Sequence, residues 1–407
     1  MATHGDAPPI GRGRENPLLR SGLPIFFRIE SANGLGLALP ENRHGQSVRV
    51  WARSLTTMQK EAIVVSLGSG AAWRLASDEG PYLDGLDAAP CPLAFMTTGM
   101  VSSYMHEILA LAEGRDITMR NLVLVQDNFY TMVGSALRGT MTGGALPVAL
   151  DVRVDTDADD DALRGLVTEA VRASPVDGLL RPRHTSLFTL TANGDECRVG
   201  RVASLGRPAE PDPGERFSRI RPAAGNAGET MTRLDAVPSV SGIAGGPGTS
   251  LQAEQRRQLH VRAFCGRRGD GVKEIEQHLH QPLGSTFRLL SNEAPDHGGT
   301  GTAPDAVSYM AAGLAFCFMT QLGRYATILK KDLPRYRIVQ DTHFSLGGAS
   351  GGSGHRSVAD AVETHVYLDT SEGEAFARQC LDMAEQTCFL HALCRTPLEP
   401  TIMVTRL

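Results

Sequence analysis

The 407-residue chain lacks several features that each point to a class of function. Its net charge is −5, so it offers no basic excess for nucleic acid, and aromatic residues make up only 5% of it. No apolar run reaches the ~18 residues of a membrane span. The polar first residues lack the apolar core of a signal peptide. The sequence therefore predicts a cytoplasmic protein that binds neither nucleic acid nor membranes.

The cysteines lack the spacing of a metal site. They form no CxxC pair, and no set of cysteines and histidines has zinc-finger spacing, so neither a metal nor a cofactor is predicted. In a reducing compartment such residues are thiols rather than structural disulfides. The seven are Cys91, Cys197, Cys265, Cys317, Cys380, Cys388 and Cys394.

What the chain does contain is one apolar stretch, twice. Residues 304–319, PDAVSYMAAGLAFCFM, overlie residues 90–105, PCPLAFMTTGMVSSYM, at an offset of 214. The same offset aligns the VQD tripeptides at 125–127 and 339–341, and it holds over more than 100 residues. A constant offset over such a length indicates an internal duplication.

The two copies differ at two positions that matter for chemistry. Cys317 falls on Ser103, and Cys388 falls on Ser174. A buried cysteine in an apolar helix is by itself usually a small hydrophobic residue. The pairing of two such differences makes Cys317 and Cys388 the candidate reactive residues.

Both copies show the same order of elements. Three short strands precede a long apolar helix, which in the first copy is predicted from Pro92 to about Glu113; two strands, a second helix, a short helix and a final strand follow. A long central helix must be covered by sheet, which predicts an α+β fold. The predicted units are a loose segment 1–22, a domain 23–194, a Gly/Pro-rich linker 195–255 and a domain 256–407. The linker is expected to wrap over the surface, with disorder of part of it as the alternative.

This arrangement resembles the OsmC/Ohr superfamily of osmotically inducible and organic hydroperoxide resistance proteins. The resemblance rests on a cysteine inside a long helix after a proline (GLAFCF) and a second cysteine 71 residues later, past the second helix (QTCFLHALC). It covers both halves, 45–193 and 258–407. It implies two OsmC-like domains that form a pseudo-dimer within one chain, with long central helices packed against antiparallel sheets. Further homo-oligomerisation is left open.

The resemblance also implies a chemistry. Cys317 would attack a peroxide as a thiolate and become a sulfenic acid, Cys388 would resolve it to a disulfide, and a thiol reductant would restore the pair. The expected substrate is a small, partly apolar electrophile, with an organic hydroperoxide as the first choice. His391, three residues after Cys388, would share its side of a helix, although such a neighbour is more often incidental than activating.

The chain departs from the peroxidase pattern at the residues that activate the thiol. Those proteins carry a Pro-Glu pair upstream of the cysteine, and the glutamate orients an arginine; here the pair is Ala306-Val307. Asp305 is the nearest acid, and Arg49 or Arg262 is the candidate cation, so Asp305 and Arg49 are the predicted substrate-binding residues.

Two other functions fit the same residues. The thiol could attack a carbon or sulfur electrophile in a metabolic step without net oxidation. Alternatively, the protein could bind or sense a small molecule without catalysis, because the first half indicates that the fold survives without the cysteines.

Overall fold

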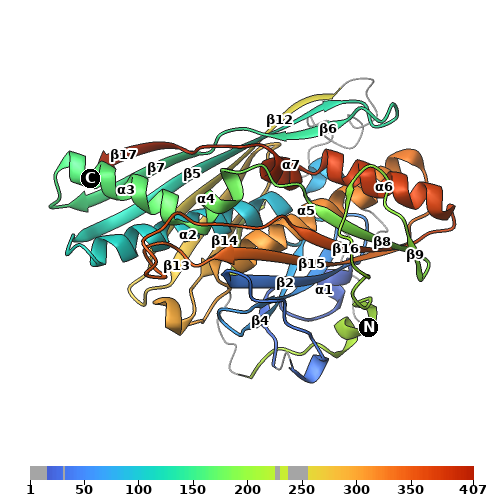
Figure 1. Ribbon diagram of the computed structural model, residues 1–407, viewed down its shortest axis with the longest axis horizontal. Coiled ribbons are helices and arrows are strands. Elements are labelled where there is room, and N and C mark those ends of the chain that lie inside the picture. Colours follow the sequence, from blue (N-terminus) through green and yellow to red (C-terminus); the bar gives the residue numbers. More distant parts are fainter. Residues whose placement is uncertain (1–15, 31–32, 225–229, 237–254) are drawn as a thin grey trace, which may run out of the picture.

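In the computed structural model, two long helices lie side by side between two sheets (Figure 1). The structure describes residues 16–30, 33–224, 230–236 and 255–407; the remaining parts of the predicted N-terminal segment and linker lie outside these residues. The helices are α2 (Pro92–Glu113) and α5 (Ala306–Leu329). Proline at the first turn of α2 and Gly114 at its C-cap set the bounds that the sequence predicts.

The first sheet joins strands from both halves of the chain. In spatial order it contains β1 (Phe27–Arg28), β4 (Ala72–Ser77), β3 (Lys60–Ser66), β2 (Gly45–Ser54), β15 (Arg335–Ser345), β16 (Glu363–Asp369), β8 (Leu187–Ala192) and β10 (Ala203–Ser204), with β9 (Asp195–Cys197) beside β8. The central pair β2–β15 is antiparallel and places Arg49 opposite Asp341.

The second sheet has the same plan. It contains β11 (Met231–Asp235), β14 (Thr286–Ser291), β13 (Lys273–Gln281), β12 (Gln255–Arg267), β5 (Met119–Gly134), β7 (Ala149–Thr156) and β17 (Thr401–Arg406), with β6 (Thr142–Ala145) beside β5. Here the central pair is β12–β5, which places Arg262 opposite Asp127.

The fold is α+β, but the prediction of antiparallel sheets is wrong at one edge of each sheet. Strand β8 runs parallel to β16, and β17 runs parallel to β7, so both sheets are mixed. The reason is connectivity: each final strand follows two helices and enters the sheet beside a strand of the other half. No hairpin therefore forces it to run antiparallel to its neighbour.

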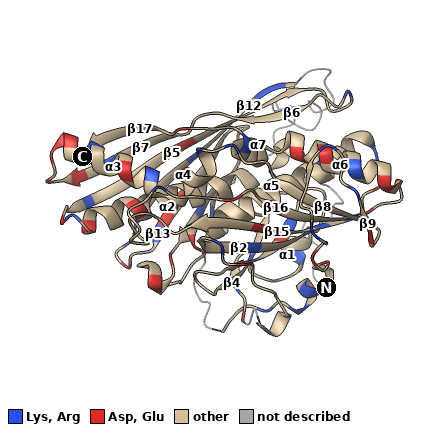
Figure 2. Cartoon of the chain, in the orientation of Figure 1, with Lys and Arg blue, Asp and Glu red and all other residues tan. Residues whose placement is uncertain are grey.

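The remaining helices cover the edges of this core. They are α1 (Pro17–Arg20), α3 (Asp160–Ala173), α4 (Pro175–Leu180), α6 (Gly373–Thr387) and α7 (Phe389–Arg395). Within the predicted loose N-terminal segment, α1 buries Leu18. Figure 2 shows that charged residues lie mainly on the outer strands and helices rather than along α2 and α5.

The two central helices approach closely at a glycine on each. A Cβ on Gly99 would lie 2.5 Å from the carbonyl oxygen of Ala306, and one on Gly313 would lie 2.8 Å from the backbone nitrogen of Met96. Both distances are too short for a carbon atom, so α2 and α5 can cross this closely only because neither position carries a side chain.

Helix α5 is long and apolar enough to cross a membrane by length and composition, contrary to the expectation from the sequence. The whole of its most apolar 18-residue window is buried inside the protein. That burial is what a core helix shows.

Part of the predicted linker, residues 203–222, packs on the outer face of the first sheet; we call it the cover segment. Glu210 in it accepts a hydrogen bond from Arg49 at 3.2 Å. Phe217 and Ile220 pack in a buried apolar cluster with Trp51 of β2. This face of the sheet is therefore closed off from solvent on the side away from the helices.

Candidate functional site

The structure brings together the two cysteines that the sequence singles out. Cys317 lies in the middle of α5, and Cys388 is the N-cap of α7. The two thiols share a hydrogen bond, and the backbone N–H of Leu390 donates to Cys317. Cys317 is 2% exposed, Cys388 is fully buried, and both are free thiols. The pair could therefore form a disulfide after only a small local movement.

Burial dominates the electrostatics of Cys317. It raises the pKa of this thiol well above the ordinary value, and the neighbouring Cys388 adds to the effect. The Leu390 N–H opposes it, because it stabilises a negative sulfur. The resting thiol is therefore protonated, and the site needs a cation nearby if it is to form a thiolate.

His391 contacts the second cysteine. Its Nδ1 lies 3.2 Å from the Cys388 sulfur, and its ring packs against Phe188 and Phe318. Burial lowers the pKa of His391 to about 4, so the imidazole is neutral at physiological pH. A neutral ring nitrogen at this distance can accept the Cys388 proton.

The matching site in the first half holds a pair of hydroxyls. Ser103 Oγ lies 2.8 Å from Ser174 Oγ, and Ser174 is the N-cap of α4, as Cys388 is of α7. At the position of His391 stands Asp177, which pairs with Arg181 and Arg356 instead. The geometry of the pair is kept in this half, but its thiols and imidazole are not.

Strands of the first half place a buried charge cluster beside Cys317. Lys60 Nζ donates to the carbonyl oxygen of Met58 at 2.8 Å and to Thr320 Oγ1 at 2.7 Å. The Thr320 hydroxyl lies 3.3 Å from Glu79 Oε1, and the Tyr82 hydroxyl donates to Glu79 Oε2 at 2.7 Å. Since Thr320 is three residues after Cys317, it lies one helical turn away on the same face of α5.

The cations of this cluster respond to the thiol. Burial lowers the pKa of Lys60 to about 8, while the charges of Glu79 and of a Cys317 thiolate raise it. Burial also lowers the pKa of Arg324, and the same two anions oppose that effect. Sequence reasoning missed Lys60 and Arg324 as neighbours of the thiol. The recurrence of the pair Lys60 and Glu79 as Lys273 and Glu293 on matching strands was the available signal.

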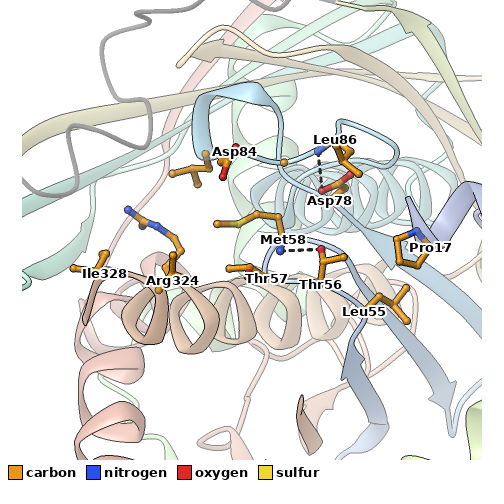
Figure 3. Close-up of a pocket in the computed structure, with 13 residues that line it drawn as sticks. Pro17, Leu55, Thr56, Thr57, Met58, Asp78, Asp84, Leu86, Arg324 and Ile328 are labelled. Atoms are coloured by element: carbon orange, nitrogen blue, oxygen red, sulfur yellow. Dashed lines mark hydrogen bonds between the residues drawn. The ribbon is translucent and has the colours of Figure 1, made fainter. Parts of the chain in front are cut away.

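A cavity of about 400 Å³ opens against this cluster (Figure 3). Arg324 projects from α5 on one side of it, and Met58 and Asp78 lie on others. Its apolar lining consists of Pro17, Leu55, Met58, Leu83, Leu86 and Ile328. Neither cysteine lines it: Cys317 is seven residues before Arg324, roughly 10 Å along the helix. A ligand in the cavity would meet the charged cluster before the sulfur.

The structure does not bring the other predicted site residues to the thiols. Arg49 forms a bidentate pair with Asp341, at 2.7 Å for both contacts, on the face of the first sheet that lies away from the helices. Arg262 makes the equivalent pair with Asp127 on the second sheet. Asp305 caps α5 through the Ser308 N–H, twelve residues before Cys317 and therefore roughly 18 Å from it.

The described part of the chain contains no group of three or more histidine, cysteine or acidic side chains arranged to hold a metal ion. The chemistry that this site offers is therefore that of its own thiols, imidazole and buried cations.

Comparison with known proteins gives two matches, both partial. Residues 299–402 match the family model described as "OsmC-like protein". The crystal structure of an OsmC-like hydroperoxide resistance protein from Jannaschia sp. CCS1 aligns with 21% identity over 31% of this chain and 79% of that chain. Its TM-score is 0.19, so this second likeness carries no argument about fold or function. No curated protein sequence matches the chain.

Proposed function

We propose, on the premise that residues 299–402 are an OsmC-like domain, that the chain reduces organic hydroperoxides through Cys317 and Cys388. The single observation that carries the proposal is the hydrogen bond between these two buried thiols, at positions where the other half holds two serines. A family that includes hydroperoxide resistance proteins supports this choice of substrate.

We further propose that the chain is a tandem duplication that folds as a pseudo-dimer. Helix α2 begins at Pro92 and α5 at Ala306, 214 residues apart, and the other helices follow at the same spacing. Strands β3 and β13 begin 213 residues apart, at Lys60 and Lys273. In the proposed pseudo-dimer, strands of the first half complete the site around the cysteine of the second half.

The reaction proceeds in two steps. The Cys317 thiolate attacks the terminal oxygen of ROOH, the O–O bond breaks, and the departing alkoxide takes up the proton that the thiol lost; the products are Cys317 sulfenic acid and ROH. The Cys388 thiol then displaces water from the sulfenic acid to form the disulfide, with His391 placed to accept the Cys388 proton. Two equivalents of an external thiol reduce the disulfide and are themselves oxidised to a disulfide.

The cavity beside Arg324 is the proposed approach for the substrate. Its apolar wall suits an alkyl or aryl group, and it leads to the buried cluster one turn from Cys317. The distance between cavity and sulfur means that side chains at its inner end have to move before the peroxide can reach the thiol.

The test is a count of free thiols with intact mass after one equivalent of cumene hydroperoxide. We expect wild type to lose two thiols and two hydrogens in mass. The Cys388→Ser variant should stop at an added oxygen on Cys317, and Cys317→Ser should not react at this rate. Slow oxidation spread over all seven cysteines would overturn the proposal.

One observation favours a second candidate, a thiol enzyme without net oxidation. Burial keeps the Cys317 thiol protonated, and the acidic residue of the peroxidase pattern is replaced by Val307. In that case a small carbon electrophile such as iodoacetamide should alkylate Cys317 selectively, while the hydroperoxide leaves the two thiols reduced.

A further inference from the structure

We infer that Lys60, a residue of the first half, is the positioning cation that stabilises the thiolate of Cys317 in the second half. The inference rests on the proposed function to the extent that Cys317 is the nucleophile. It assigns to Lys60 the part that the sequence led us to expect of Arg49, which lies on the opposite face of its sheet.

The contacts of Lys60 hold its ammonium group on the side of α5 that carries Cys317. The side chain is fully buried, and Nζ is fixed by the Met58 carbonyl and by the Thr320 hydroxyl, one turn beyond the cysteine. A buried ammonium without water needs a negative partner. Glu79 is one such partner, and a thiolate at Cys317 is the other.

The matching lysine in the serine half is held differently. Lys273 Nζ donates directly to Glu293 Oε1 at 2.9 Å, which neutralises its charge. In the cysteine half the Thr320 hydroxyl stands between Lys60 and Glu79, and no direct ion pair joins these two residues in the described part of the chain. Lys60 therefore keeps more of its charge for a second anion, in the half that has a sulfur able to become one.

The other groups around Cys317 do not replace this role. They are Thr320 and Arg324 on α5, Glu79 after β4, Tyr130 on β5, and Cys388, His391 and Cys394 around α7. Of these only Arg324 is a cation at neutral pH. Its carbon count places it at the cavity rather than over the sulfur, because it follows Cys317 by seven residues.

In the reaction Lys60 neither gains nor loses a proton. When the Cys317 thiol ionises, its proton is the one that the departing alkoxide later takes up. The ammonium group stays beside the negative sulfur until the sulfur bonds to oxygen.

The test titrates Cys317 without any substrate. Thiolate absorbance at 240 nm is followed against pH, and the Cys317→Ser protein is subtracted to isolate this one group. We expect Lys60→Met to move the ionisation of Cys317 up by about one pH unit or more, a tenfold loss of thiolate at a given pH. Lys60→Arg, which restores the charge, should return most of the shift.

Lys273→Met is the matched control, because it removes the equivalent buried lysine from the serine half. It should leave the Cys317 titration unchanged. Circular dichroism verifies folding of each variant, and Lys60→Met combined with Glu79→Gln removes the unpaired carboxylate if the single variant does not fold.

The outcomes separate this inference from the proposed function. If Lys60→Met shifts the titration but wild type does not reduce cumene hydroperoxide, the inference holds and the proposed substrate is wrong. If wild type reduces the hydroperoxide and Lys60→Met leaves the titration of Cys317 unchanged, Lys60 has only a structural role. Equal shifts in Lys60→Met and Lys273→Met, or no ionisation of Cys317 in the accessible pH range, would also overturn the inference.

Discussion

At the scale of single residues, the two halves are separated by the replacement of oxygen by sulfur. Ser103 and Ser174 keep the contact that Cys317 and Cys388 make, so the geometry alone does not define the site. What differs around it is the third group, where His391 stands in one half and Asp177 in the other. The chemical difference between the halves is therefore concentrated in three positions and their buried neighbours.

The burial of His391 makes stability depend on pH. Its pKa is about 4 in the folded protein against an ordinary value near 6.5, so the unfolded chain binds the proton more tightly. This contribution to stability is complete above pH 6.5 and is lost as the pH falls toward 4. We expect wild type to lose about 2 kcal/mol more than His391→Gln between pH 7 and pH 5, measured by urea denaturation.

His355→Gln is the control for this prediction, because His355 is exposed. It should retain the wild-type dependence on pH. A His391→Gln protein that loses as much stability on acidification as wild type would show that the imidazole is not held neutral by the fold.

At the scale of the elements, the crossing of α2 and α5 sets the distance between the two halves. We expect Gly99→Ala to destabilise the protein by about 1–3 kcal/mol, because the new Cβ would meet backbone atoms of α5 that cannot move without shifting the helix. Urea denaturation measures the change.

Gly165→Ala in α3 is the matched control, since nothing lies within 4 Å of a Cβ there. In a helix interior this exchange should stabilise by up to ~1 kcal/mol. Equal effects of the two substitutions would mean that the helices do not cross as closely as described.

The elements also show what the sequence could predict. The bounds of α2 follow from its proline, its apolar run and Gly114, all of which are local signals. The contact of Cys317 with Cys388 could be predicted only through the family resemblance. The neighbours Lys60 and Glu79 could not, because they come from strands more than 230 residues earlier and depend on which half completes which sheet. Local patterns do not record such pairing.

At the scale of the whole molecule, neither half contains a complete sheet. The central strand pairs β2–β15 and β5–β12 each join the first half to the second. We expect the first half, expressed alone with the chain divided within residues 237–254, to be insoluble, because its strands would present unpaired edges and its helix would lose its partner.

Co-expression of the two pieces should restore a soluble 1:1 complex, detected by size-exclusion chromatography. The intact chain is the control for yield. A first half that elutes alone as a folded monomer would contradict the shared sheets.

The pairing of β2 with β15 has a consequence for how the protein is made. Arg49 must wait for Asp341, 292 residues later, before its ion pair can form. At about 5–20 residues per second, a ribosome needs roughly 15–60 s to deliver the partner strand. During that time a nascent first half with an open, apolar sheet edge is on the ribosome. Its yield in a cell will therefore depend on the chaperones that bind nascent chains, and on the speed of translation between the two strands.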